Sequence, residues 1–234
     1  MNFKNIILIP YRNRESQLKK FLNDVVPLVI AHMPKTKVVF IEQNEGKGFN
    51  RGKILNVGFQ IFKEETEYFI TNDVDTYPLD KCILKYYNKP VGTNEVLAIL
   101  TSDANTMGGT IKIKSESIHK INGFPNNIWG WGAEDRALQN RAYFFHIKKK
   151  KCLTTKQKNK NSNPEYFLVL DDIREPRIKN YHETHRIFHY KQFKNFDSKK
   201  KKEIIFESGL NNLDYNIIKR EILGPCAEII TVNI

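Results

Sequence analysis

Short apolar runs alternate with amphipathic segments over the first third of this sequence. Residues 6–9, 37–42 and 68–71 are predicted to be buried strands, because each is a brief apolar run bounded by polar residues or proline. Residues 12–30 and 50–62 carry apolar side chains at helical spacing. The β-α-β-α-β order predicts an α/β fold with a mostly parallel sheet and helices on its faces. Ligands of such sheets bind at the carboxyl ends of the strands.

The remaining two thirds of the sequence alternate less regularly. The pattern predicts strands over residues 95–100, 167–170 and 229–232, helices over residues 114–122 and 134–145, and an exposed loop or hairpin over residues 148–164. No linker rich in proline, glycine or serine divides the chain. We therefore expect a single domain over residues 1–234.

The formal net charge of +12 is high. Much of the excess lies in two lysine-rich runs, residues 148–160 and 199–202, which we expect to be solvated loops. Such charge can indicate nucleic acid, a membrane surface or a polyanionic substrate. A nucleic-acid module would interleave basic residues with aromatic ones on one face, so we expect no nucleic-acid partner. Peripheral contact of the lysine-rich runs with an acidic glycan or a membrane surface is the interpretation left open.

The three cysteines lie far apart and show no metal-type spacing, so we expect reduced thiols. The first residues lead directly into the predicted strand at residues 6–9 and lack the apolar stretch of a signal peptide. No apolar run approaches the length of a membrane span. The sequence therefore predicts a soluble protein, cytoplasmic or otherwise, with no signal peptide, membrane anchor or integral membrane segment.

Asp73, Val74 and Asp75 directly follow the third predicted strand. Two carboxylates spaced i, i+2 at a strand end point to the same side. Hard divalent cations such as Mg²⁺ or Mn²⁺ take oxygen ligands and leave coordination positions open for phosphate. The spacing therefore favours a site for a metal and a diphosphate. An Asx turn after a strand is the structural alternative.

Two further segments place cations where helices are predicted to begin. Arg12 and Arg14 follow the first strand, and a helix N-terminus favours anions, so both side chains could reach a phosphate. Phe49 and Arg51 repeat the arrangement, with an aromatic ring available for stacking. The alternatives are exposed ion pairs for the arginines and an ordinary helix cap at Asn50.

Residues 121–135 (INGFPNNIWGWGAED) combine aromatic rings, glycines and adjacent acids. Aromatic rings suit the apolar faces of sugars, and the carboxylates of Glu134 and Asp135 can accept protons from hydroxyl groups. The glycines on either side of Trp131 allow the ring to swing or the backbone to approach a ligand. A tryptophan-rich turn at the edge of the core is the alternative.

Half of the six histidines stand together as His182, His185 and His189. Their spacing puts all three on one face of a helix. Imidazole is a common metal ligand, so we expect at least one of them to be a ligand. A patch that contacts a polyanion is the alternative.

Several motifs occur in the order and approximate spacing of a known family. They are IPYRNR at residues 9–14, FNRGKILNVGF at 49–59, NDVDTYP at 72–78, GG at 108–109, the run at 121–135 and SGLNNL at 208–213. Over essentially its whole length the chain closely resembles the beta-1,4-galactosyltransferase family. The resemblance implies a GT-A fold, with a nucleotide-binding half at residues 1–80 and an acceptor-binding half at residues 81–234.

The resemblance also implies an activity. It is the inverting, metal-dependent transfer of Gal or GalNAc from a UDP-sugar to a hydroxyl group of a glycan or glycoconjugate, in beta linkage. Mn²⁺ or another divalent cation is the implied cofactor. The alternatives are a non-catalytic nucleotide- or glycan-binding relative of the same fold and, on net charge alone, a basic polyanion-binding protein.

The resemblance assigns roles to individual residues. The donor nucleotide is expected to contact Pro10, Tyr11, Arg12, Arg14, Phe49, Arg51, Asp73 and Val74. The expected metal ligands are Asp75, His182 and His185, with His189 as an alternative. Asp135 matches the family's catalytic base, and the residues expected at the sugar and the acceptor are Thr106, Gly109, Trp129, Trp131, Gly132 and Glu134.

The sequence departs from the family's pattern in four places. Arg136 and Ala137 follow the acid pair where the family often has further acids, which bears on the acceptor. Thr106 stands where galactose-specific members have tyrosine, and its smaller side chain could admit an N-acetyl group. Residues 101–107 look shorter than the family's loop and offer no match to its phosphate-contacting lysine. The family's anchor, stem and disulfide cysteines have no counterpart in this sequence.

Overall fold

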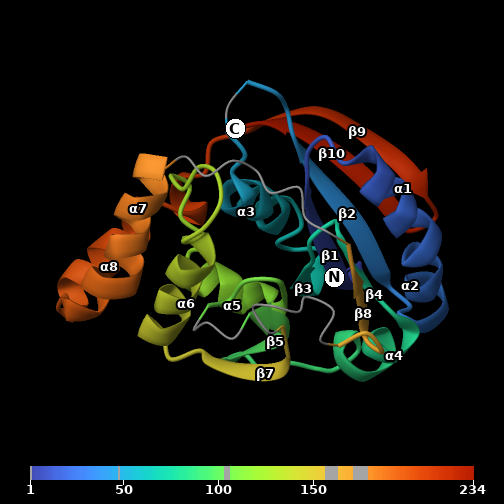
Figure 1. The fold of residues 1–234 in the computed structure, drawn as a ribbon, viewed down its shortest axis with the longest axis horizontal. Helices are drawn as coiled ribbons and strands as arrows, with labels where there is room; N and C mark the ends of the chain where they lie inside the picture. The colour runs from blue at the N-terminus through green and yellow to red at the C-terminus, as the bar shows by residue number, and fades with distance from the viewer. Residues whose placement is uncertain (1, 47, 103–105, 156–162, 171–178) are drawn as a thin grey trace.

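The computed structural model describes residues 2–46, 48–102, 106–155, 163–170 and 179–234. Its centre is an eight-stranded sheet in the order β7-β5-β6-β3-β1-β2-β10-β9 (Figure 1). The strands are β1 (Phe3–Tyr11), β2 (Thr36–Gln43), β3 (Thr66–Thr71), β5 (Glu95–Ser102), β6 (Thr110–Lys114), β7 (Lys148–Thr155), β9 (Asn216–Gly224) and β10 (Ala227–Asn233). A second sheet consists of β4 (Thr76–Pro78) and β8 (Phe167–Val169).

Strands β10, β2, β1 and β3 run parallel in the middle of the sheet. Leu8 of β1, for example, lies between Val39 of β2 and Thr71 of β3. Strand β6 pairs antiparallel with both β3 and β5, β9 pairs antiparallel with β10, and β7 pairs parallel with β5. The predicted α/β fold with a mostly parallel sheet is confirmed, and the carboxyl ends of β1, β2 and β3 meet at one side of it.

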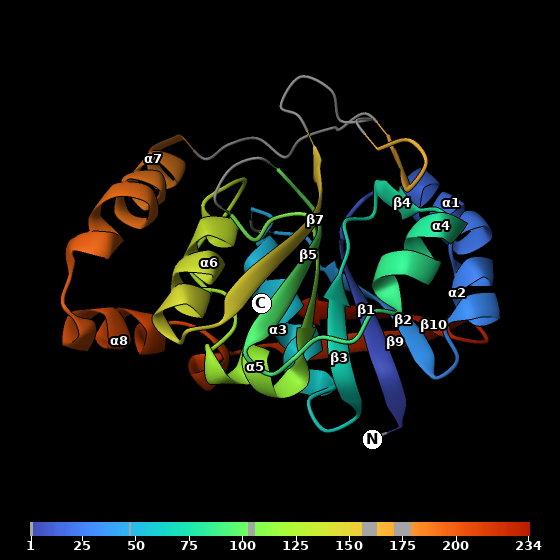
Figure 2. The ribbon, with the colours of Figure 1, turned by 90° about the horizontal axis from the view of Figure 1, so that it is seen from below.

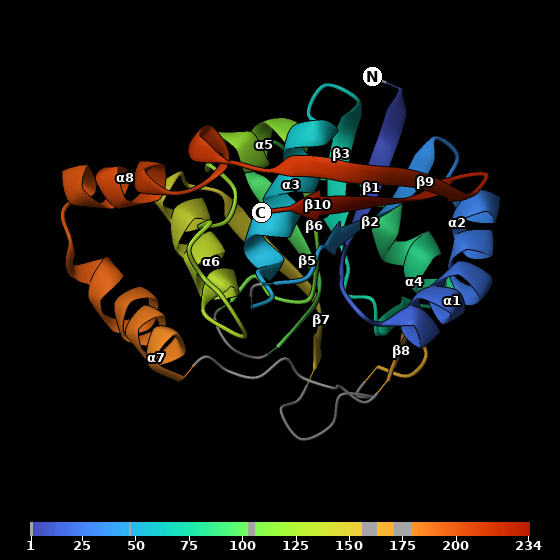
Figure 3. The same ribbon diagram turned by 90° about the horizontal axis from the view of Figure 1, so that it is seen from above.

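Helices cover both faces of this sheet (Figures 2 and 3). Helices α1 (Glu15–Asp24) and α2 (Val26–His32) lie on one face, and α3 (Arg51–Ile61), α5 (Ser115–Lys120) and α6 (Glu134–Phe144) lie on the other. Alternate residues of a strand point to opposite faces. Ile7 therefore enters the core beneath α1 and α2, whereas Leu8 enters the core beneath α3. The remaining helical segments are α4 (Asp80–Cys82), η1 (Ile83–Tyr87), α7 (Lys179–Ile187), η2 (Phe188–Gln192), η3 (Phe193–Asn195), α8 (Ser198–Glu207) and η4 (Leu210–Asn212).

The helix predicted over residues 12–30 is two helices in the structure. Helix α1 ends at Asp24, and α2 begins at Val26. Pro27 lies in the first turn of α2, where its missing N–H costs nothing, but in a continuous helix it could not donate to the carbonyl four residues earlier. The helices predicted over residues 50–62, 114–122 and 134–145 are confirmed as α3, α5 and α6.

The loop or hairpin predicted over residues 148–164 is wrong in its first half, because residues 148–155 form β7 at one edge of the sheet. Long aliphatic stems and charged ends suit lysine to an edge strand, and Lys150 forms an ion pair with Glu95 of β5. Residues 156–162 lie outside the described residues. The loop predicted at residues 199–202 is also wrong, since this run belongs to α8, whose first turn is capped by Asp197.

Cys82, Cys152 and Cys226 are all free, as expected from their spacing. Among the helices of the described residues, none combines the length and the apolar character needed to cross a membrane.

Candidate active site

Polar residues gather where the central parallel strands end. Arg51 opens α3 just beyond β2, and Asp73 and Asp75 follow β3. Helix α3 begins at this point because Asn50 caps it, with its side-chain oxygen accepting the backbone N–H of Lys53 at 2.9 Å.

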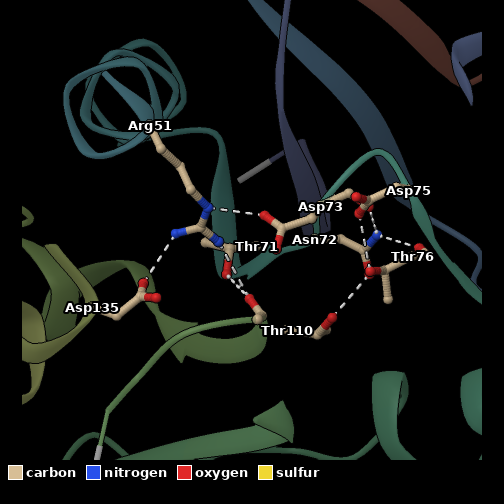
Figure 4. Close-up of polar contacts among 9 residues, drawn as sticks. Arg51, Thr71, Asn72, Asp73, Asp75, Thr76, Thr110 and Asp135 are labelled. Carbon is tan, nitrogen blue, oxygen red and sulfur yellow. Dashed lines mark hydrogen bonds and ion pairs between the residues drawn. The ribbon is translucent and has the colours of Figure 1, made fainter. Parts of the chain in front are cut away.

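Arg51 extends from α3 between two carboxylates that are far apart in the sequence (Figure 4). Its Nε donates to Asp73 Oδ1 at 2.9 Å, and its Nη1 donates to Asp135 Oδ1 at 3.1 Å. Its Nη2 donates to the carbonyl of Gly109 at 3.4 Å. Burial alone would lower the pKa of Arg51, but Asp73, Asp135 and Glu134 together hold that pKa above its ordinary value. A permanently charged guanidinium thus joins the end of β3 to the start of α6.

Asn72 is a buried residue that fixes the turn carrying the two aspartates (Figure 4). Its Nδ2 donates to the carbonyls of Asp73 at 2.8 Å and Thr76 at 2.7 Å. Its Oδ1 accepts the hydroxyl groups of Tyr87 at 2.5 Å and Thr110 at 3.1 Å. Every hydrogen-bonding position of the amide is used. Sequence reasoning missed this residue, and its place between a buried strand and the aspartates was the only signal.

The two aspartates diverge within the turn. Figure 4 shows the carboxylate of Asp73 turned toward Arg51 and that of Asp75 near Thr76, whose hydroxyl donates to Asp75 Oδ1 at 3.3 Å. Val74 between them is buried in the core beneath α1 and α2. The backbone carbonyl of Asp75 accepts the N–H of Leu170 at 3.1 Å, so the segment after β8 also holds this turn.

Gly108 leaves the space that the Asp135 carboxylate occupies. A Cβ atom built on Gly108 would lie 2.1 Å from Asp135 Oδ2, so a larger residue would displace the carboxylate. Gly109 has a φ of +81°, and a Cβ atom there would lie 2.4 Å from the carbonyl oxygen of Leu100. The N–H of Met107 donates to the carbonyl of Asp135 at 3.2 Å. Sequence reasoning placed Gly109 at the site but missed Gly108, although both belong to the same motif.

Thr106 lies buried just before the glycine pair, and residues 103–105 beside it lie outside the described residues. Its carbonyl accepts Lys149 Nζ at 2.9 Å and the hydroxyl group of Thr101 at 3.3 Å. Lys149 also donates to Gln139 Oε1 of α6 at 2.6 Å, and burial lowers the pKa of Lys149 to about 8. Strand β7 thereby stabilises the segment from Thr106 to Gly108, which contacts the Asp135 carboxylate.

Residues on the β1 side of the site meet the tryptophan segment. The guanidinium carbon of Arg12 lies 5.2 Å from the centre of the Phe49 ring. The carbonyl of Phe49 accepts the N–H of Gly130 at 2.7 Å. The other residues predicted here are Pro10 and Tyr11, which are buried, and Arg14, which is half-buried.

The tryptophan segment reaches α6 through left-handed backbone. Gly130, Gly132 and Ala133 have φ values of +77°, +102° and +78°. Trp129 is half-buried, whereas 40% of Trp131 is exposed. The two glycines adopt this conformation without steric cost, but Ala133 carries strain. The glycines flanking Trp131 therefore serve the backbone turn into α6.

The first turn of α6 carries two acidic residues, Glu134 and Asp135, whose pKa values are raised. Glu134 is only 6% exposed, and its Oε2 has no hydrogen-bond partner in the described part of the chain. Burial, reinforced by Asp135, raises the pKa of Glu134 to about 8. Burial also raises the pKa of Asp135, while Arg51 opposes the shift. Both carboxyl groups of this pair therefore bind their protons more tightly than ordinary acidic side chains do.

The histidines lie away from Asp75 in this structure. His182 and His185 belong to α7. In Figures 1 and 2, α6 lies between α7 and β4, the strand that directly follows Asp75. The ring of His185 stacks on that of His189 with centres 6.1 Å apart. The side chain of His182 lies outside the described residues. No group of three or more His, Cys, Asp or Glu side chains suited to a metal occurs in the described ranges.

Comparison with protein families identifies the chain. The N-terminal region of glycosyl transferase group 7 matches residues 1–88, and the family described as the N-terminal domain of galactosyltransferase matches residues 98–162. The chain belongs to the beta-1,4-galactosyltransferase family. Human beta-1,4-galactosyltransferase 4 is 38% identical over 149 residues, which cover 61% of this chain and 43% of that protein. Human beta-1,4-galactosyltransferase 1 is 33% identical over 147 residues, which cover 60% and 37%. The chain thus matches less than half the length of these relatives.

Solved structures agree with this galactosyltransferase-family assignment at the level of the fold. The catalytic domain of Drosophila beta1,4-galactosyltransferase 7 with xylobiose is 22% identical, has a TM-score of 0.75, and is matched over 99% of this chain and 94% of that one. The mannosyltransferase PcManGT from Pyrobaculum calidifontis is 11% identical, has a TM-score of 0.57, and is matched over 84% and 66%. The implied GT-A fold is confirmed.

In this galactosyltransferase-family chain some of the predicted site residues lie close together and others lie apart. Arg51, Asp73, Gly109, Glu134 and Asp135 lie together. The α7 histidines lie apart from Asp75, so the full ligand set stays a prediction.

Proposed function

We propose that this chain is an inverting, metal-dependent glycosyltransferase that moves Gal or GalNAc from a UDP-sugar to a hydroxyl group of a glycan. The observation that carries the proposal is the Arg51 bridge. Arg51 donates hydrogen bonds to Asp73, at the end of β3, and to Asp135, at the start of α6. The strand end is where α/β sheets bind their ligands. Family membership supports the same activity.

On the donor side, cations and an aromatic ring surround the strand ends. Arg12 and Arg14 follow β1, and Arg51 lies in the first turn of α3. These guanidinium groups would bind the diphosphate by charge-assisted hydrogen bonds, and Asp73 would contact the nucleotide. The Phe49 ring already lies under Arg12 and offers a stacking surface.

A divalent cation, Mn²⁺ foremost, is proposed beside Asp75. The fit rests on donor chemistry, because a partly exposed carboxylate at the strand end is the oxygen ligand that such a cation takes. His182 and His185 are the further ligands proposed, and this requires another position of α7 than the one in the structure. When bound, the cation would neutralise charge on the departing diphosphate. A structure of the Drosophila relative contains manganese and UDP-Gal, which supports the choice.

Asp135 is the proposed general base. It would accept the proton of the acceptor hydroxyl group as that oxygen bonds to the anomeric carbon from the face opposite the diphosphate. The bond from the anomeric carbon to the diphosphate oxygen would break, UDP would leave, and the configuration would invert. Arg51 would orient Asp135 and stabilise the charge that develops on the phosphate. Oε2 of Glu134, which has no hydrogen-bond partner among the described residues, would accept a hydrogen bond from a hydroxyl group of the sugar.

The donor preference depends on Thr106 in this proposal. Because threonine is smaller than tyrosine, we propose that the pocket admits an N-acetyl group and that UDP-GalNAc is turned over at least as fast as UDP-Gal. Strong preference for UDP-Gal would contradict this.

The free thiols of all three cysteines support placement in a reducing compartment such as the cytoplasm. Contact of the lysine-rich β7 and α8 segments with an acidic glycan or membrane surface stays a prediction.

The test is a donor screen that measures UDP release with Mn²⁺, a panel of UDP-sugars and simple glycosides as acceptors. We expect acceptor-dependent release from UDP-Gal or UDP-GalNAc, and release at least about 100-fold slower from the Asp135→Asn variant. Binding of UDP with Mn²⁺ but no release from any donor would instead support a non-catalytic relative. Absence of both would refute the proposal.

A further inference from the structure

Strand β9 is the outermost strand on one side of the sheet and bonds only to β10 among the described strands (Figure 3). Seven consecutive residues, 216–222, are exposed. Three apolar side chains in this stretch are exposed: Ile217 by 44%, Ile218 by 51% and Ile222 by 74%. The backbone groups along the outer side of such a strand form a template for another strand.

The two edges of the sheet differ in charge pattern. The opposite edge, β7, begins with four consecutive lysines, Lys148 to Lys151. Two copies of β7 would bring like charges together, which disfavours pairing. Strand β9 instead carries a cation, Lys219, and an anion, Glu221, on the same face of the strand.

The sequence of β9 is self-complementary about Arg220. When a second copy runs antiparallel with Arg220 opposite Arg220, Lys219 faces Glu221, Ile218 faces Ile222 and Ile217 faces Leu223. Each oppositely charged pair then occurs twice by symmetry. A shift of one residue would place Ile218 opposite Glu221 and lose this match.

We propose that two copies of this chain associate through β9, in antiparallel register centred on Arg220, to form a continuous sheet across the dimer. The centre of the strand is suited to this, because its ladder with β10 is regular from Lys219 to Ile222. The irregularities of the ladder lie outside that stretch, at Ile218 and Leu223.

The facing arginines do not oppose the pairing strongly, because each has a partner within its own copy. Arg220 Nη2 lies 3.0 Å from Glu228 Oε1 of β10, and the guanidinium carbon of Arg220 lies 5.9 Å from the centre of the Phe62 ring. Glu228 is buried and also pairs with Lys37 at 3.0 Å. The arginine is thereby drawn toward β10 and α3 of its own copy.

The contact is small, since one strand pair buries less than the roughly 1,200 Å² typical of stable complexes. We therefore expect a dimer that forms reversibly with concentration. The net charge of +12 on each copy opposes association at low salt, so measurements belong at about 0.15 M salt, where the Debye length is about 8 Å.

The experiment is analytical ultracentrifugation of the whole chain and five variants, three in β9 and two controls, over a concentration series. Lys219→Glu and Glu221→Lys each replace both cross-strand pairs by like charges. We expect each to raise the dimer dissociation constant at least about tenfold. An equimolar mixture of the two variants restores opposite charges at both positions, and the double variant carrying both changes does so within one chain. Both should dimerise like the unchanged protein.

Two charge-matched controls lie elsewhere on the surface. Glu64→Lys and Lys199→Glu should leave dimerisation unchanged, because neither residue lies on β9. The rescue by mixing separates the cross-strand pairing from the pair that Lys219 and Glu221 form within one copy at 2.8 Å, since mixing cannot repair the latter.

Circular dichroism of each variant shows whether the fold is kept, and the readout requires no turnover. A protein that stays monomeric at every concentration overturns the proposal. So do single variants that dimerise unchanged, or a mixture that fails to rescue. Pairing of β9 with an added extended peptide while the chain itself stays monomeric would point to a different partner and likewise overturn it.

Discussion

Arg51 donates to groups on three separate segments: Asp73 after β3, Asp135 in α6 and Gly109 before β6. The resemblance of their motifs to those of the family assigned each of these residues to the site. It did not show that one side chain joins them, since the distance of 84 residues between Arg51 and Asp135 leaves no local signal. Asn72 and Gly108 were missed for the same reason, because their roles depend on neighbours that only the folded chain supplies.

The clearest prediction at this scale concerns Asp135. Replacing it by asparagine keeps the shape but removes the base, so kcat should fall by about 10²- to 10⁴-fold. Isothermal titration should show nearly unchanged binding of UDP with Mn²⁺. A variant that retains most of its kcat would exclude Asp135 as the base.

Gly108 offers a test of the position of that carboxylate. Alanine at residue 108 would collide with Asp135 Oδ2, so we expect kcat to fall at least about tenfold with little change in melting temperature. Gly224→Ala is the matched control, because a Cβ atom there meets nothing within 4 Å. Equal kcat values for the two variants would show that Gly108 does not determine the position of the Asp135 carboxylate.

The raised pKa of Asp135 predicts a pH dependence. The base must be deprotonated, so kcat/KM should fall as pH drops through a pKa higher than that of an ordinary aspartate. Asp73→Asn removes a neighbouring carboxylate that raises the pKa of Asp135, so it should move this acid limb to lower pH. A profile of kcat/KM against pH for both proteins measures the shift, and a limb that stays in place contradicts the coupling.

At the scale of elements, the strongly periodic segments were predictable and the weakly periodic ones were not. The strands at β1, β2 and β3 and helices α3 and α6 follow from apolar patterns that burial on the sheet requires. Strand β7 was missed because its lysines carry no apolar alternation, and its pairing with β5 supplies the hydrogen bonds that make it a strand. Strands β6 and β9 and helix α8 were not predicted either. The exposure of β9 on both faces explains why no pattern marks it.

The entry to α6 stores strain that a substitution can relieve. Ala133 has a φ of +78°, which costs an L residue about 1–2 kcal/mol. Glycine adopts this conformation freely but loses more entropy on folding, so Ala133→Gly should stabilise the protein by roughly 0.5–1 kcal/mol. Urea denaturation measures the difference. Ala137→Gly, in the buried helix interior, should destabilise by about 1 kcal/mol or more and serves as the contrast.

For the whole molecule, the candidate site joins segments from both halves of the sequence, so a ligand bound there should stabilise the entire domain. Asp75 belongs to the turn after β3, while Asp135 belongs to α6. The hydrogen bonds of Arg51 to Asp73 and to Asp135 connect these two segments. The sequence predicted the sheet and the residues, but it could not place α7 relative to Asp75, because that position depends on the contacts that the following segment, η2, makes with α6.

We expect Mn²⁺ and UDP together to raise the melting temperature more than either does alone, because binding to the folded state stabilises it by mass action. At 100 times the dissociation constant the gain is about 2.7 kcal/mol. Asp75→Ala should abolish the joint effect, whereas Asp214→Ala, at an exposed position, should keep it. A joint shift that survives in Asp75→Ala would remove Asp75 from the metal site.

The placement of β10 between β2 and β9 has a consequence for synthesis on the ribosome. Gln43 at the end of β2 and Ala227 at the start of β10 are 184 positions apart, so at 5–20 residues per second β2 waits roughly 10 to 40 s for its second neighbour. During that time a nascent chain presents an apolar strand with an open hydrogen-bonding row. Such a chain is a substrate for chaperones, and premature termination before residue 227 should yield aggregates.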